Sequence, residues 1–191
     1  MHIQCTKTML DYVKPNITEH NTDNDMYAWH AHLIKRSGKN LLVLMHDLSR
    51  FTVVFYGLKK SHIKELYPMI SVAVMNAMMD AGIPLDAIGA YVDRRPESLS
   101  FNKTKNRTLV ARLNKAVEMA DHILSTDGYH PDSIEQRHAS LFCNELLVCE
   151  DNYKVCYYPK DKLREYLELF LDKWLPRSLL CYEKVGHIGS T

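Results

Sequence analysis

The sequence lacks any long apolar run. No stretch approaches the roughly 18 consecutive apolar residues that a transmembrane helix needs. The first ten residues, MHIQCTKTML, have neither the basic start nor the apolar stretch of a secretion signal. The net charge is only +1 with histidine counted as neutral, so no global excess of positive charge indicates a nucleic-acid partner. We therefore expect a soluble, cytoplasmic protein that binds no membrane.

Familiar catalytic and metal-binding motifs are also missing. The sequence has no P-loop, GxGxxG, HExxH or GxSxG motif. The five cysteines are Cys5, Cys143, Cys149, Cys156 and Cys181. None forms a CxxC pair and their spacing fits no common zinc site, so we expect reduced thiols and no cofactor. Cys143 and His138 could form a thiol nucleophile, but a buried structural cysteine is the favoured interpretation.

What is present is the residue pattern of a small α+β protein. The predicted strands are residues 3–6, 26–36, 40–47, 50–56 and 98–102. The third of these is apolar almost throughout (LLVLM), as in a strand that is buried on both faces. Apolar residues at helical spacing predict long helices from Tyr67 to Gly82 and over 104–126. We therefore predict a small antiparallel sheet of three to five strands packed against two long helices.

A polar break, DGYHP at 127–131, is the best candidate for a domain boundary, because Gly and Pro interrupt the chain there. It divides the sequence into an α+β domain (1–126) and a mainly helical C-terminal extension (127–191). Within the extension, residues 161–175 predict a helix that is apolar over much of its circumference. Burial against the first domain is the plainer interpretation, and a homodimer contact is the alternative. The candidate interface residues are Leu169, Phe170, Leu171 and Trp174.

Three histidines and an aspartate lie in one predicted hairpin. If residues 38–39 form a two-residue loop, Asp47 lies opposite His30. His30, His32 and Asp47 then share one face of the sheet. His46 points to the other face, so the three imidazoles cannot converge on one metal. Two imidazoles and a carboxylate remain a candidate set of metal ligands, but an ordinary cross-strand polar pair is favoured.

The second candidate site is the start of the predicted helix at 104–126. Cations crowd its first half and acids follow later, which opposes the helix dipole at a cost of a few tenths of a kcal/mol per charge. An anion held by the free N–H groups and flanking cations would offset that cost. A solvated helix face is the simpler alternative. The candidate anion- or partner-binding residues are Lys103, Lys105, Arg107, Arg112 and Lys115, with Lys59 and Lys60 as additions.

Four stretches of the sequence resemble a small uncharacterised domain family of bacteria, plasmids and phages. They are IQCTKTMLDYV, WHAHL, LVLMHDLSRFTVVFYGLKK and NKTKNRTLVARLN. The resemblance covers about residues 1–126 and implies a small α+β domain in a mobile element. The family has no established reaction, so the resemblance names no catalytic residues. The family's pattern usually has asparagine at the position of His32, which argues against a metal pair. The chain also looks like phage-encoded anti-CRISPR proteins, which inhibit host defence nucleases.

Together these features favour a binding protein over an enzyme. We predict a protein that binds a protein partner, such as a defence nuclease, as an anti-CRISPR inhibitor does. The first alternative is a nucleic-acid-binding protein that uses the basic helix start at 103–115, with affinity that falls steeply with salt. The second is a metal-dependent hydrolase on His30, His32 and Asp47, which would contain bound metal.

Overall fold

The computed structural model describes residues 1–17, 25–150 and 153–172. The elements in chain order are β1 (His2–Cys5), α1 (Lys7–Val13), η1 (Asp25–Tyr27), β2 (Ala28–Arg36), β3 (Lys39–His46), β4 (Thr52–Tyr56), η2 (Lys60–Glu65), α2 (Leu66–Asp80), α3 (Leu85–Asp93), β5 (Ser100–Lys103), α4 (Arg107–Thr126), α5 (Arg137–Asn144), β6 (Val148–Glu150), β7 (Val155–Tyr157) and α6 (Pro159–Asp172). The predicted α+β class is confirmed. No helix among the described residues is both long enough and apolar enough to span a membrane.

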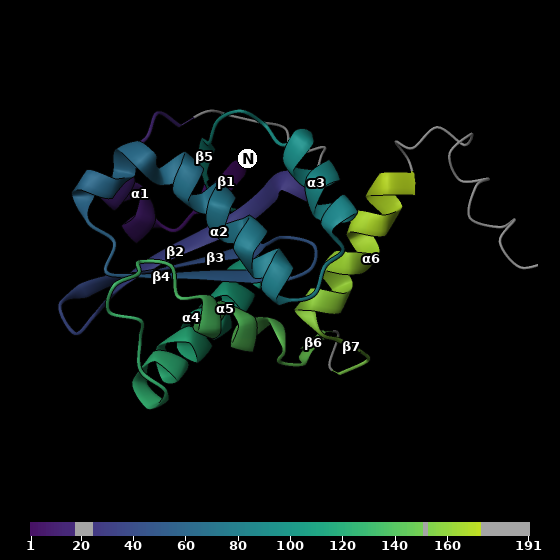
Figure 1. Ribbon diagram of the computed structural model, residues 1–191. Helices are drawn as coiled ribbons and strands as arrows, with labels where there is room; N and C mark the ends of the chain where they lie inside the picture. The colour runs from purple at the N-terminus through teal and green to yellow at the C-terminus, as the bar shows by residue number, and fades with distance from the viewer. Residues whose placement is uncertain (18–24, 151–152, 173–191) are drawn as a thin grey trace, which may run out of the picture.

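The main sheet has five strands in the order β4-β3-β2-β1-β5 (Figure 1). Strands β2, β3 and β4 form the predicted antiparallel meander. Strand β1 pairs in parallel with both β2 and β5, so the sheet is mixed and not wholly antiparallel. Two parallel neighbouring strands are joined by a crossover connection, and α1 lies in the connection between β1 and β2.

Helices cover both faces of the sheet, so the molecule has three layers (Figure 1). Helices α2 and α3 pack on one face, over a core that includes Trp29 and Phe55. Helices α4 and α5 pack on the other, over a second core that includes Val43 and Met45. Strand β3 lies between two strands and contributes to both cores, since Leu44 belongs to the first. This double burial explains its apolar run.

The β2–β3 turn comprises Ser37 and Gly38, so the loop predicted at 38–39 is wrong by one residue. Both turn residues have positive φ (45° and 79°), as a tight two-residue hairpin requires. His30 consequently lies opposite Met45 and not opposite Asp47. The register is shifted by two residues, which preserves the alternation of faces. His30 and His46 therefore lie on opposite faces, as predicted.

Strand β4 is an edge strand whose outer backbone groups are bonded by α5. The Asn144 side chain accepts the Thr52 N–H at 2.7 Å and donates to the Thr52 carbonyl at 2.9 Å. The Ser140 hydroxyl accepts the Val54 N–H at 2.9 Å, and the Gln136 N–H donates to the Val54 carbonyl at 2.8 Å. The helix thus occupies backbone groups that an edge strand would otherwise offer to another chain.

Helix α6 packs beside α3 (Figure 1), with Leu163 and Leu167 fully buried in the Trp29 core. Among the candidate interface residues, Phe170 and Leu171 are half-buried against that core, whereas Leu169 is 57% exposed. Trp174 lies outside the described residues. Burial against the first domain therefore accounts for much of the apolar face. The homodimer contact stays a prediction.

Two cysteines are paired, which corrects the expectation that all five are reduced. Cys149 on β6 lies directly opposite Cys156 on β7, and a disulfide joins them. The pairing depends on the register of a short hairpin, which the cysteine spacing alone does not reveal. Cys5 and Cys143 are buried free thiols, and Cys181 lies outside the described residues. This hairpin also interrupts the extension that was predicted to be mainly helical.

Candidate functional site

His30 is fully buried and has a partner at each ring nitrogen. Its Nδ1 lies 2.6 Å from Oδ1 of Asp47, and its Nε2 lies 2.9 Å from the hydroxyl oxygen of Thr104. The side-chain amide of Gln4 donates to the second carboxylate oxygen of Asp47 at 2.9 Å. Asp47 reaches His30 from the turn after β3. The predicted His30–Asp47 pair is therefore confirmed, as a diagonal pair and not as directly opposed residues.

The other two histidines have separate partners. His32 shares a hydrogen bond of 2.7 Å with the hydroxyl of Thr6, and burial lowers the pKa of its ring. His46, on the opposite face, lies 2.8 Å from the hydroxyl of Ser49. No cluster of three or more His, Cys, Asp or Glu suited to a metal occurs in the part of the chain that the structure describes. A metal at His30 would have to displace one of its two present partners.

The cations predicted to form one patch lie in three places. Arg112 and Lys115 line a pocket beside α4. Lys59 and Lys60 line a second, larger hollow at one end of the sheet. Lys103 lines a shallow third one beside α1. The sequence therefore identified cations that border hollows, but it grouped residues that the fold separates.

The start of α4 is capped by the protein's own Asn106. The side-chain oxygen of Asn106 accepts the N–H groups of Thr108 at 3.0 Å and Leu109 at 3.1 Å. This N-cap satisfies two of the donors that a bound anion would otherwise use. Lys105 and Arg107, which flank Asn106, are exposed and form no ion pair with any described residue. An anion at this helix start would thus find fewer free N–H groups than the sequence suggests.

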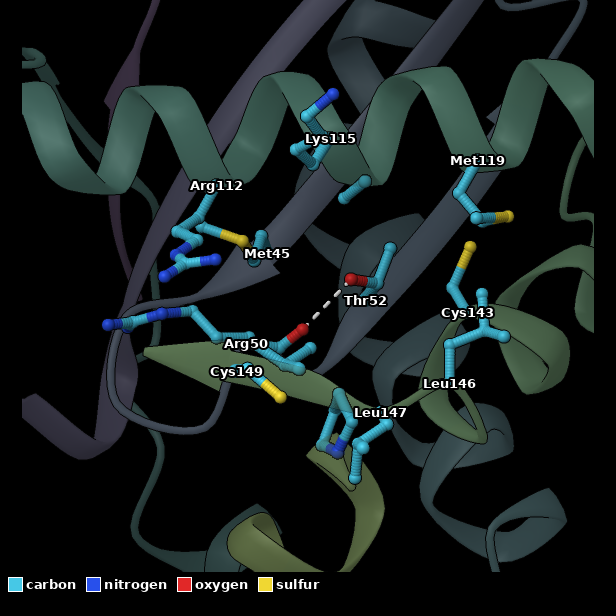
Figure 2. A pocket seen from close by; sticks show the side chains of 13 residues that line it. Met45, Arg50, Thr52, Arg112, Lys115, Met119, Cys143, Leu146, Leu147 and Cys149 are labelled. Carbon is cyan, nitrogen blue, oxygen red and sulfur yellow. Dashed lines mark hydrogen bonds between the residues drawn. The ribbon is translucent and has the colours of Figure 1, made fainter. Parts of the chain in front are cut away.

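The pocket beside α4 has a volume of about 240 Å³ and lies between α4, the β3–β4 turn and the segment from α5 to β6 (Figure 2). We call it the α4 pocket. Its cations are Arg50, Arg112 and Lys115. Figure 2 shows the Arg50 and Arg112 side chains at the same end of the pocket. The apolar lining includes Met45, Ala116, Met119, Cys143, Leu146, Leu147, Val148 and Pro159.

The three cations of the α4 pocket differ in their pairing. Arg50 forms an ion pair with Glu150, with Nη2 2.8 Å from the carboxylate oxygen, while its Nη1 is buried and has no hydrogen-bond partner among the described residues. Lys115 lies 2.8 Å from Glu118 on the exposed side of α4. Arg112 is half-buried and has no hydrogen bond or ion pair with any residue that the structure describes. Arg112 is therefore the cation best placed to receive an anion.

Arg50 is a site residue that the sequence interpretation missed. It sits in the tight β3–β4 turn with φ 62°, a left-handed conformation that is unfavourable for a side chain of this kind. Several hydrogen bonds hold the turn. The Arg50 N–H donates to the His46 carbonyl, and the Thr52 hydroxyl donates to the Arg50 carbonyl (Figure 2). The available signal was a lone cation, in LSRF, between two apolar strands.

The thiol of Cys143 lies in the α4 pocket, but its environment disfavours nucleophilic chemistry. Burial raises the pKa of Cys143 to about 12, and that of Cys5 also to about 12. Both therefore remain neutral thiols near neutral pH, and the thiolate is the nucleophilic form. His138 pairs with Asp127, at 3.2 Å. A buried structural cysteine is the interpretation that agrees with these contacts.

We expect the free energy of unfolding to fall as pH rises from 9 toward 12. An unfolded thiol titrates near pH 9, whereas folded Cys5 and Cys143 keep their protons to about pH 12. Their contribution is complete below pH 9 and is lost as pH rises through the folded pKa, because the unfolded chain releases protons first. Urea denaturation across this range measures the decline. It should be shallower in Cys143→Ala, and an unchanged slope in that variant would contradict the assignment.

The fold and site together define a small α+β protein in which a mixed sheet lies between helices and arginines border an apolar pocket. Residues 2–162 match the family described as "Domain of unknown function (DUF6933)", and the chain belongs to that family. The match confirms the resemblance seen in the sequence and extends it through α5 into α6. No curated protein and no solved structure matches the chain. The likeness to anti-CRISPR proteins gains no support from these comparisons.

Proposed function

We propose that this protein is a binding protein whose α4 pocket holds an organic acid, a carboxylate joined to a small apolar group. One observation carries the proposal: Arg112 is half-buried at an apolar pocket and has no carboxylate partner among the described residues. A guanidinium recognises a carboxylate through two parallel N–H···O bonds, and such charged hydrogen bonds are stronger than neutral ones. Arg50, which lines the same pocket, adds a second positive charge near Arg112, although its own guanidinium is paired with Glu150.

The apolar lining supports an acid with an apolar tail over a purely polar anion. Met45, Met119 and Leu147 line the pocket, and methionine adapts its shape to irregular ligands. The volume of about 240 Å³ is smaller than the roughly 300–1,000 Å³ of drug-sized sites, so the ligand is small. An acidic side chain next to an apolar one on a partner protein presents the same groups as a free acid.

Isothermal titration calorimetry with octanoate, and with octanol as its uncharged counterpart, tests the proposal. We expect octanoate to bind and octanol to bind at least about tenfold more weakly, because a hydrogen bond to a charged group contributes about 1.5–3 kcal/mol. Arg112→Gln should weaken octanoate binding about tenfold for the same reason. Arg107→Gln is the matched control, since Arg107 is an exposed arginine of the same helix outside the pocket lining.

Two results would contradict binding in the α4 pocket. One is equal affinity of Arg112→Gln and the parent protein for octanoate, and the other is an equal loss of affinity in Arg112→Gln and Arg107→Gln. A peptide with aspartate beside leucine, titrated in the same way, separates the two sources of the acid. Binding of the peptide but not of octanoate, with loss in Arg112→Gln, assigns the carboxylate to a partner protein. Failure of both ligands would overturn the proposal.

A further inference from the structure

A second hollow, of about 670 Å³, lies at the end of the sheet where the β2–β3 hairpin turns. Its walls are the hairpin tip, the chain that follows β4, Tyr12 of α1 and the loop between α4 and α5. Among the described residues that line it, Asp132 alone carries a carboxylate. Four lysines line the hollow, which we call the lysine groove: Lys35, Lys39, Lys59 and Lys60.

These lysines have no carboxylate partners in the described part of the chain. The Lys39 ammonium donates to the Tyr129 hydroxyl at 3.2 Å, and the Lys60 ammonium donates to the backbone carbonyl of Tyr12. Lys35 and Lys59 are exposed and form no ion pair with a described residue. Four positive charges around one hollow repel each other, and a ligand with several negative charges relieves that repulsion.

Aromatic rings lie between the lysines. Tyr129 is 41% exposed and packs edge-on against Tyr56, with ring centroids 4.9 Å apart. The Lys39 ammonium lies 4.7 Å from the centroid of the Tyr129 ring, and the Lys60 ammonium lies 4.1 Å from that of Tyr12. Cations interleaved with an exposed ring are typical of sites for single-stranded nucleic acid, where phosphates meet the cations and bases stack on the ring.

Backbone bonds fix the walls of the groove relative to each other. Gly57 has φ 86°, a conformation that glycine adopts without strain, and its N–H donates to the Asn40 carbonyl at 2.8 Å. The Asn40 side chain donates to the Leu58 carbonyl at 2.5 Å. The start of β3, which carries Lys39, is thereby held against the segment that carries Lys59. The cations are thus presented on an ordered surface.

We propose that the lysine groove binds nucleoside phosphates, with the phosphates at Lys35 and Lys59 and a base on Tyr129. The site is separate from the α4 pocket and does not depend on the acid proposed there. A single strand of nucleic acid and a free nucleotide share this chemistry. The strand fits the groove better, because its successive phosphates can meet successive lysines.

Fluorescence anisotropy with a labelled oligothymidylate, measured over a range of salt concentrations, tests the lysine groove. We expect affinity to fall with salt, and Lys35→Ala/Lys59→Ala to weaken binding at least about tenfold. The slope of log affinity against log salt should decrease by about 1.4 in that variant, since each phosphate contact on a single strand contributes about 0.7. Tyr129→Ala should weaken binding about tenfold and leave the slope unchanged, because stacking involves no counterion release.

The matched control is Lys103→Ala/Lys105→Ala, which removes the same charge from two exposed lysines outside the groove, one at the end of β5 and one in the loop before α4. This control should bind the oligothymidylate within about twofold of the parent protein if each phosphate contact is made in the groove. Equal losses in the two double variants would overturn the proposal in favour of diffuse charge. Thymidine triphosphate is titrated in the same way. If it binds as tightly as the strand, and if Lys35→Ala/Lys59→Ala abolishes that binding, the ligand is a free nucleotide. Binding of neither would overturn the proposal.

Discussion

Replacement of His30 by alanine should lower the free energy of unfolding by about 4 kcal/mol. His30 is fully buried and joins Asp47 to Thr104 through its two ring nitrogens. Without the ring, the carboxylate of Asp47, which is only 10% exposed, loses its closest partner and keeps the amide of Gln4. Loss of a hydrogen bond to a charged group costs about 1.5–3 kcal/mol, and the cavity left by the buried ring adds to this.

His32→Ala is the matched control for His30→Ala. His32 lies on the same strand and the same face, but it is half-buried and bonds only the hydroxyl of Thr6 among the contacts described. One neutral hydrogen bond contributes about 1 kcal/mol, so we expect a loss of about that size. Urea denaturation of both variants gives the comparison. Equal decreases in the free energy of unfolding would show that the His30–Asp47 pair stabilises the protein no more than other contacts on this face of the sheet.

Replacement of Asn144 by alanine should lower the free energy of unfolding by about 3 kcal/mol. Asn144 is fully buried, and its side chain bonds both the N–H and the carbonyl of Thr52, which is 2% exposed. The alanine variant leaves both backbone groups buried without partners, and each such group costs about 1–3 kcal/mol. The edge of β4 would then be open to local fraying or to pairing with another chain.

Ser140→Ala is the control for the edge strand, because its hydroxyl accepts only one β4 backbone N–H, that of Val54. We expect the free energy of unfolding to fall by about half as much as in Asn144→Ala, because one backbone group loses its partner and not two. Hydrogen exchange followed by NMR locates the effect: the Thr52 amide should lose protection selectively in Asn144→Ala. Full protection of that amide in the variant, with a small change in stability, would show that α5 contributes to β4 by packing alone.

Several features of the fold could be predicted from single stretches of sequence. The apolar run of β3 indicated a strand buried on both faces, and the alternation along β2 and β3, joined by a two-residue turn, placed His30 and His46 on opposite faces. The prediction for the histidines rests on the two-residue repeat of a strand and on the length of the turn. The turn lies one position earlier than predicted but keeps its two residues, so the register moves by two and the faces are unchanged. The long helices were predicted for the same kind of reason, since their 3.6-residue repeat is a local property of the backbone.

The tertiary structure decided which distant residues meet. Arg50 and Glu150 are 100 positions apart and form an ion pair beside Arg112, and Lys35 and Lys59 border one groove with the loop near Tyr129. Such meetings depend on the order of the strands and on the path of the chain between them. The path of the chain minimises the exposed apolar surface of the whole molecule, so no local periodicity of the sequence encodes it. The sequence by itself therefore determined the faces of each element, and the packing of those elements determined the sites.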